Sequence, residues 1–394
     1  MCYGLYSTTY FFDVGPHLPP DSPIWNNLCE KIESEKIQGT IRSILQFEKS
    51  ELTYPFQAST LNIGSMLSIG KYAPYYLFSA LYKKNGKNLE DSLINAWGKG
   101  FYKQVLKSYM ETFLKSDPKN ISNNYSPRFR PPQLKKTLIS FSKSFFKSKK
   151  SPSFRDKLYP KYGCADLIHV IVDEIEQNGV QIKKNMTIEK LIHQDRSVKI
   201  VSKNSWGELE AETFDKVIWS APISDLVKLL GLVEYDKFKY LNLLTINCAI
   251  TKKYLLEHNA HCAYIMMPNI FFHRIYEPKK LSRFMTPESQ TSVCIEVTLE
   301  DKPENFDPLI KKCLKQFRDI YSLSESQIKL LGYEYFENVY PHLFIDNKYY
   351  FDNLENELHR RFKNIFLIGR IGKYYPFGIR ETLESVIKNE HLEI

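Results

Sequence analysis

The sequence predicts an α/β fold with a second, α+β unit inserted into it. Residues 159–185 read as strand, helix and strand in succession, an order typical of layered α/β architecture. Residues 365–391 add an apolar strand that ends at a glycine and is followed by a helix. Between these segments, residues 238–345 hold several strand-like runs and one helix, which indicates a separate mixed sheet.

The composition is typical of a soluble globular protein and sets limits on its function. Of 394 residues, 43% are hydrophobic and 25% are charged, which suffices for two domains. The net charge of +9 comes from Lys spread along the chain, so we favour a coding bias over a surface for anionic lipid, nucleic acid or nucleotide-linked substrate. The seven cysteines are scattered and never spaced CxxC, so we expect no disulfide framework and no metal site, and a cytoplasmic protein.

The first part of the chain is predicted to be mostly helical. Residues 10–14 read as an aromatic strand, and residues 56–115 carry apolar side chains at helical spacing until Asp117-Pro118 stops the run. Residues 134–147 could form a basic amphipathic helix, either on a membrane surface or packed on the protein itself. We favour the second interpretation. No apolar run is long enough to span a bilayer.

Strands dominate the remainder. An amphipathic helix that ends at Gly179 precedes a strand over 180–185. Residues 187–221 predict a three-stranded meander ending in "KVIWSA", after which Pro222 begins a short helix. Five strands follow over 238–345, with a helix over about 306–322. We therefore assign residues 1–55, 151–232 and 355–394 to the first domain, and residues 56–150 and 233–354 to the second.

Common catalytic motifs are missing from the sequence. It contains no GxGxxG, GxxxxGK[ST], HExxH or GxSxG, and no recognisable nucleic-acid module. What remains is a pair of apolar strands that end at glycines, in "FFDVGPH" and in "IFLIGR…FGIRETLESV". A glycine allows the backbone to approach a ligand closely, and the helix that starts at Gly378 could present N–H groups to an anion.

Four segments in order resemble a known superfamily. They are "CYGLYSTTYFFDVGPH", "WGKGFYKQVLKSYMETFLKSDPKNIS", "YPKYGCADLIHVIVDEIEQNGVQIKKNMTIEKL" and "FLIGRIGKYYPFGIRETLESV". The set is similar to the FAD-dependent amine oxidase, protoporphyrinogen oxidase and phytoene desaturase superfamily, including its relatives that resemble UDP-galactopyranose mutase. This resemblance implies a Rossmann-like FAD-binding domain in discontinuous pieces, a substrate domain, and FAD as cofactor.

The resemblance also implies where the cofactor lies along the first half of the chain. Gly15, Pro16 and His17 match the turn that lies against the flavin. Ile188 matches the position whose backbone meets the adenine. Ser220 and Pro222 border the channel that holds the dinucleotide.

The C-terminal segment supplies the other implied contacts. Gly369, Arg370, Gly378 and Ile379 match positions beside the pyrophosphate, ribityl and isoalloxazine parts of FAD. Tyr340 matches a tyrosine of the substrate pocket, although a buried core tyrosine explains it equally well. No catalytic residue can be named, because neither paired carboxylates nor an activated nucleophile is evident.

The sequence departs from the superfamily at one important point. Family members begin with a strand, a GxGxxG loop and a helix, and this sequence contains no such unit. Without it we expect FAD affinity to collapse, unless Met1 is an internal methionine of a longer protein.

Three functional hypotheses follow. The first is a FAD-dependent oxidoreductase that transfers a hydride from a C–H or C–N bond of a small-molecule substrate to flavin N5. The second is a truncated, catalytically incompetent family member. The third is a flavin enzyme that acts on a nucleotide sugar without net redox change. Neither the substrate nor the oligomeric state can be derived from the sequence.

Overall fold

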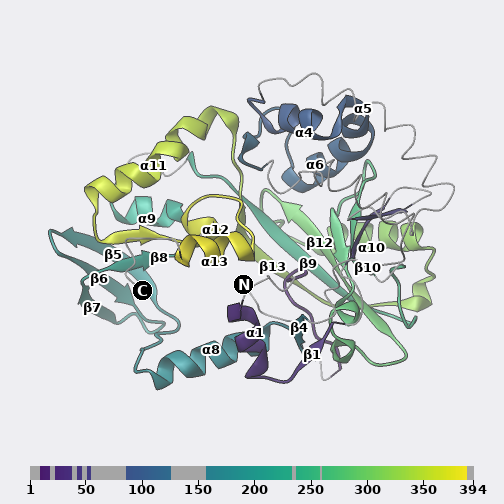
Figure 1. Cartoon of the computed structure of the whole chain (residues 1–394), viewed down its shortest axis with the longest axis horizontal. Helices are drawn as coiled ribbons and strands as arrows, with labels where there is room; N and C mark the ends of the chain where they lie inside the picture. The colour runs from purple at the N-terminus through teal and green to yellow at the C-terminus, as the bar shows by residue number, and fades with distance from the viewer. Residues whose placement is uncertain are drawn as a thin grey trace, which may run out of the picture.

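The computed structural model of this chain has a mixed α/β fold built around one large sheet (Figure 1). The segment 134–147 and the first half of the expected helical region, residues 56–85, lie outside the described residues. The structure describes residues 9–17, 23–37, 42–46, 51–54, 86–125, 157–232, 237–257 and 260–387.

The large sheet has seven strands and confirms the strands expected over 238–345. Its order is β13-β9-β12-β11-β10-β2-β3, and every neighbouring pair is antiparallel except β10 and β2. The strands are β2 (Arg42–Gln46), β3 (Glu51–Tyr54), β9 (Tyr240–Ile250), β10 (Ala260–Ile265), β11 (Arg274–Tyr276), β12 (Thr291–Leu299) and β13 (Ile328–Pro341).

Both faces of this sheet are covered. Helix α10 (Asp307–Tyr321) packs on one face through Ile310, Cys313 and Phe317, which are spaced to lie on one side of the helix. The other face packs against helices of the 86–125 segment. Every residue of β9 after Tyr240 is buried as a result, so the strand has no polar, solvent-facing side.

The helical segment confirms the helices expected before Asp117. It consists of α4 (Leu89–Trp97), α5 (Lys99–Phe101), a π-helical stretch (Tyr102–Leu106) and α6 (Lys107–Leu114). Asn88 caps α4 by accepting a hydrogen bond from the Asp91 N–H. Helix α6 ends where Lys115 adopts a left-handed conformation with φ 53°. Among the described residues, no helix has the length and apolar character needed to cross a bilayer.

The remaining elements form three small groups. Helix α1 (Pro23–Glu30) and α8 (Ala165–Gln177) lie beside the antiparallel pair β1 (Ser34–Lys36) and β4 (Leu158–Pro160) (Figure 1). An antiparallel sheet contains β5 (Thr187–Gln194), β6 (Ser197–Lys203) and β7 (Leu209–Phe214). The third group is a parallel pair, β8 (Val217–Trp219) and β14 (Ile365–Leu367), with α9 (Ile223–Leu229), α11 (Lys348–Arg361), α12 (Gly369–Gly372) and α13 (Ile379–Ile387).

Four details differ from the sequence-based expectations. Residues 10–14 do not form the expected strand, since only Phe11 takes part in a bridge. The meander does not end in "KVIWSA" but at Phe214, because residues 217–219 leave it to pair with β14. Residues 180–185 are not a strand, since none of the described strands pairs with them. Residues 42–46 and 51–54, which we assigned to the first domain, are hydrogen-bonded into the seven-stranded sheet. The division into two domains as a whole stays a prediction.

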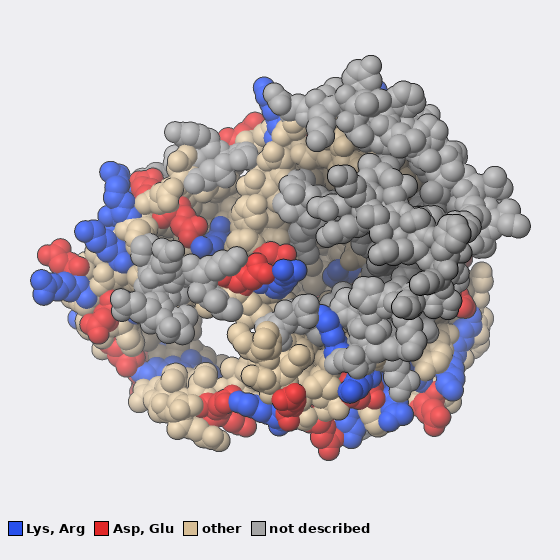
Figure 2. Space-filling model, in the orientation of Figure 1, with Lys and Arg blue, Asp and Glu red and all other residues tan. Residues whose placement is uncertain are grey.

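Helix α8 is covered much less than its sequence suggests. Its apolar face includes Ile168, Ile171 and Ile175, and all three are only half-buried. In Figure 2 an opening passes through the molecule above α8, beside α1. Ile218, on the nearby strand β8, is 52% exposed. An amphipathic helix normally buries such a face against a sheet, and here the parallel sheet consists of two short strands among the described residues.

This difference in covering predicts unequal costs for the same substitution. Ile246→Ala, in the middle of β9 at 0% exposure, should lower the free energy of unfolding by about 2–5 kcal/mol. Ile171→Ala, on the half-buried face of α8, should cost about 1 kcal/mol or less, since fewer contacts are lost. Urea unfolding followed by circular dichroism measures both. Equal costs would show that the face of α8 is fully covered.

Candidate functional site

The turn at Gly15 is held by contacts from two strands of the large sheet. The Asp13 carbonyl accepts hydrogen bonds from the Gly15 N–H at 2.8 Å and from the Tyr276 hydroxyl at 2.5 Å. Gly15 has φ 81°, and a Cβ there would lie 3.4 Å from Arg274 Nη2 and from both carboxylate oxygens of Glu296. Glycine is therefore favoured by the left-handed backbone conformation, while the neighbouring side chains lie at ordinary contact distance. Pro16 and His17 follow directly and are half-buried.

The side chain of Asp13 ties this turn to the 159–164 segment. Its carboxylate is 3% exposed and accepts hydrogen bonds from the Tyr159 hydroxyl at 2.5 Å and the Cys164 N–H at 2.7 Å. Burial raises the pKa of Asp13 to about 6, against the lowering effect of these two hydrogen bonds. The contact also fixes Gly163, whose φ is 104° and whose added Cβ would lie 2.9 Å from Asp13 Oδ1.

Sequence reasoning missed Asp13. The one signal it offered was an acidic residue within the apolar run "YFFDVG", where a buried carboxylate needs a partner.

A buried ion pair lies beside the Gly15 turn. Arg274 donates from Nε and Nη2 to the two carboxylate oxygens of Glu296, at 2.8 and 2.6 Å. Glu296 is 0% exposed, and the two residues face each other across β11 and β12. The pair is bidentate, the arrangement in which arginine holds a carboxylate most firmly.

An aromatic cavity of about 130 Å³ lies next to this ion pair. Arg274 lines it on one side and Tyr340 on another, and the guanidinium of Arg370 lies over the Tyr340 ring at 5.0 Å. The Gly15 turn and the Arg370 segment are far apart in the sequence. Each contacts a residue that lines this cavity: Gly15 lies beside Arg274, and Arg370 lies over Tyr340. The cavity is lined by Leu45, Trp97, Leu106, Tyr109, Met110, Phe113, Tyr264, Met266, His273, Arg274 and Tyr340.

The C-terminal residues implied as flavin contacts differ in what they offer. Gly369 has φ 73°, and nothing lies within 4 Å of the position of an added Cβ, so its backbone borders open space. The Arg370 Nε donates to the Phe377 carbonyl at 2.6 Å. The Gly378 N–H donates to the Glu381 carboxylate at 2.9 Å, so this helix start already holds an anionic group. Ile379 is the first residue of α13 and is half-buried.

The other implied contacts gather around β8 and not around the cavity. Ser220 is exposed directly after β8, and the Pro222 carbonyl accepts a hydrogen bond from Trp219 Nε1 at 3.1 Å. Helix α12 packs closely here, since a Cβ on Gly372 would lie 2.7 Å from the Trp219 carbonyl. Ile188 on β5 is half-buried and packs against the core cluster that also contains Val217 and Trp219 of β8. The structure therefore brings Ser220 near the Gly369 segment.

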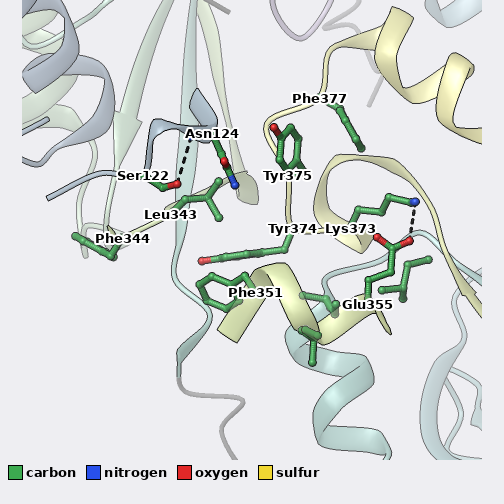
Figure 3. Close-up of a pocket in the computed structure, with 13 residues that line it drawn as sticks. Ser122, Asn124, Leu343, Phe344, Phe351, Glu355, Lys373, Tyr374, Tyr375 and Phe377 are labelled. Carbon is green, nitrogen blue, oxygen red and sulfur yellow. Dashed lines mark hydrogen bonds and ion pairs between the residues drawn. The ribbon is translucent and has the colours of Figure 1, made fainter. Parts of the chain in front are cut away.

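A second cavity, of about 230 Å³, lies between α11 and the 373–377 segment (Figure 3). Tyr374, Tyr375 and Phe377 line it from one side, and an ion pair between Lys373 and Glu355, at 2.7 Å, lies at its edge. The Tyr374 hydroxyl donates to the Lys239 carbonyl at 2.6 Å and so anchors the segment to the main sheet. These contacts position the loop between α12 and α13.

The aromatic cavity combines apolar side chains with groups that can exchange protons, namely His273 and the hydroxyls of Tyr109, Tyr264 and Tyr340. Among the described residues that line it there is no carboxylate, serine or cysteine side chain. The nearest carboxylate, Glu296, is fully engaged by Arg274. A redox reaction at this cavity would therefore need the electron-accepting group to come from a cofactor.

Comparisons with known proteins identify the fold. No protein-family model matches the sequence, and no curated protein matches it. Among solved structures, reduced UDP-galactopyranose mutase is similar with a TM-score of 0.74 at 18% identity, over 95% of this chain and 81% of that chain. A protoporphyrinogen oxidase-like protein from Exiguobacterium sp. 255-15 has a TM-score of 0.68 at 14% identity, over 100% and 90%. An oxidoreductase from Methanosarcina mazei has 0.60 at 13%, over 98% and 90%. At these identities the likeness shows the fold alone.

The buried carboxylate predicts a pH-dependent stability that an amide would lack. The folded-state pKa of Asp13, about 6, lies above its ordinary value of 3.8, so folding binds the proton more tightly. Its stabilising contribution is present below pH 3.8 and is lost as the pH rises through about 6. Relative to Asp13→Asn, the wild type should lose about 2 kcal/mol of unfolding free energy between pH 4 and pH 7. Urea unfolding of both proteins at the two pH values measures this difference.

Asp13→Ala should be less stable than Asp13→Asn, and the comparison of their unfolding free energies tests the two hydrogen bonds of this side chain. Asparagine can accept from the Cys164 N–H and donate to the Tyr159 oxygen, whereas alanine leaves both groups unpaired, at about 1–3 kcal/mol for each. A wild type whose stability follows that of Asp13→Asn at every pH would show that the carboxylate is not buried.

Proposed function

We propose that this chain is a FAD-dependent oxidoreductase of the amine oxidase and protoporphyrinogen oxidase type, which transfers a hydride from a C–H or C–N bond to flavin N5. The observation that carries the proposal is the meeting of two segments at one aromatic cavity. The Gly15 turn packs on Arg274, and Arg370 lies over Tyr340, while both Arg274 and Tyr340 line the cavity. The similarity of the fold to that of reduced UDP-galactopyranose mutase and the protoporphyrinogen oxidase-like protein supports it.

The described residues fit FAD in part. Gly15 and Gly369 have backbones that a side chain would strain or crowd, and the open space beside Gly369 gives a ligand access to its backbone. The Gly378 N–H fits less well, because Glu381 already occupies it and an anion would have to displace that carboxylate. The sequence also has no GxGxxG loop to bind the pyrophosphate.

The chain's own residues would bind and orient the cofactor and the substrate, and would exclude water from the reacting bond. FAD, when bound, supplies the hydride acceptor. The Asp13 contacts fix the Gly15 turn. The Arg274–Glu296 ion pair packs beside this turn, and the two charges neutralise each other. Aromatic and apolar side chains around the cavity exclude water from the reacting bond.

Two alternatives have observations of their own. A flavin mutase that acts on a nucleotide sugar is favoured by the structural similarity to UDP-galactopyranose mutase. An incompetent family member is favoured by the two-stranded parallel pair β8–β14 and the half-buried face of α8, which leave the proposed FAD domain poorly covered among the described residues. Protein that stays colourless after incubation with FAD would support the incompetent member. Substrate oxidation in air, against isomerisation only after flavin reduction, separates the first two.

A glycine pair tests the FAD site directly. Gly369→Ala places a methyl group in the open space where we propose FAD to lie, and should weaken FAD binding at least tenfold. Gly231→Ala is the matched control, since it has a similar positive φ of 66°, also with nothing within 4 Å, and should show only the loss of stability. Titration of the purified protein with FAD, followed by flavin fluorescence, measures both affinities. Equal affinities for the two variants would remove Gly369 from the proposed site.

A further inference from the structure

The aromatic cavity has the size and lining of a site for a single ring. Its volume is about 130 Å³, and an apolar protein cavity of about 150 Å³ is large enough to bind benzene. Eight of the side chains that line it are aromatic or aliphatic, and none of these is more than 8% exposed. They are Leu45, Trp97, Leu106, Tyr109, Met110, Phe113, Met266 and Tyr340. A cavity lined in this way favours an apolar occupant over water.

The aromatic walls are packed against one another in fixed orientations. Tyr109 meets Tyr264 edge to face, with ring centroids 5.7 Å apart and planes at 82°. Phe113 meets Tyr340 in the same way, at 5.3 Å and 79°. Such pairs hold their rings in place, so the cavity is already formed and a ring entering it would meet both faces and edges of aromatic groups.

The arginine that lines the cavity is paired. The charge of Arg274 is matched by Glu296 through two hydrogen bonds. Its guanidinium also lies 5.9 Å from the centre of the Tyr264 ring. His273 also lines the cavity, and the guanidinium of Arg370 lies over the Tyr340 ring at 5.0 Å. At Arg274 an anionic ligand would meet a charge that is already neutralised by Glu296, and would lose its own hydration there without gaining a new partner.

We propose that this cavity binds one uncharged ring of the substrate, and that Glu296 is the specificity-determining residue, because it cancels the charge of Arg274 and so excludes anionic ligands. In terms of the proposed function, on which this role rests, the ring is the part of the substrate next to the bond that is oxidised. The substrate class is therefore a neutral aryl or cycloalkyl compound and not a nucleotide sugar.

A matched pair of small probes tests the charge preference without FAD. The probes are p-cresol and p-hydroxybenzoate, which carry a methyl group and a carboxylate at the same ring position. UDP-galactose is the third ligand. Calorimetric titration of the purified protein without added flavin should show p-cresol binding at least tenfold more tightly than the other two. Comparable or tighter binding of p-hydroxybenzoate or UDP-galactose would overturn the proposal.

Two methionines provide the site control. Met266 lines the cavity, whereas Met267 is equally buried, at 6%, but packs in the core on the α10 side of the sheet. Met266→Phe fills part of the cavity and should weaken p-cresol binding at least tenfold, while Met267→Phe should leave it unchanged. If the Met266 variant binds like wild type, the ring lies elsewhere and the proposal fails.

Glu296→Gln tests the role of the ion pair. By leaving Arg274 with an unmatched charge, it should reverse the preference, so that p-hydroxybenzoate binds more tightly than p-cresol. A folded Glu296→Gln variant with the wild-type preference would overturn the role of Glu296. Since these titrations use protein without flavin, a failure to bind FAD would count against the proposed function and leave the ring site standing.

Discussion

The buried carboxylate of Asp13 is the interaction on which the geometry of the candidate site depends. Its carboxylate accepts hydrogen bonds from the Tyr159 hydroxyl and the Cys164 N–H, and these hydrogen bonds offset part of the cost of burying it. Because the partners belong to residues 159–164, the carboxylate fixes the Gly15 turn relative to β4 and the start of α8. The Asp13 carbonyl is bound in turn by Tyr276, so one residue joins the small β1–β4 pair to the large sheet.

Local patterns predicted most of the elements, and long-range pairing decided what they missed. The apolar spacing in α8 and α10 and the apolar runs of β9 and β12 are local features, and the structure confirms them. No strand was predicted in residues 42–46 and 51–54, and nothing in their sequence indicated which sheet they join. Residues 180–185 have the apolar character of a strand, but a strand exists only where a neighbour pairs with it.

The candidate site shows the same division between local and distant information. The positive φ values of Gly15 and Gly369 agree with the argument from glycine at the ends of apolar strands. The contact between Gly378 and Glu381 was also readable, because a glutamate three residues after a helix start commonly bonds back to the backbone N–H there. The cavity was not readable, since its walls come from β2, the 97–113 helices, β10, β11 and β13, which no sequence pattern brings together.

The two sides of the proposed site differ in how completely the described residues bury their apolar surface. On the cavity side, the sheet is covered on both faces and Glu296 and Arg274 satisfy each other. On the other side, the apolar face of α8 remains half-buried, and Ile218 of β8 is 52% exposed, although β14 itself is buried. A ligand or chain segment that covers these faces binds the folded state alone and therefore stabilises it. Burial of about 25 cal/mol per Å² of apolar surface makes this the place where binding would add most to stability. The cavity side, in contrast, gains little from a partner, which is why its specificity rests on the matched charges of Arg274 and Glu296.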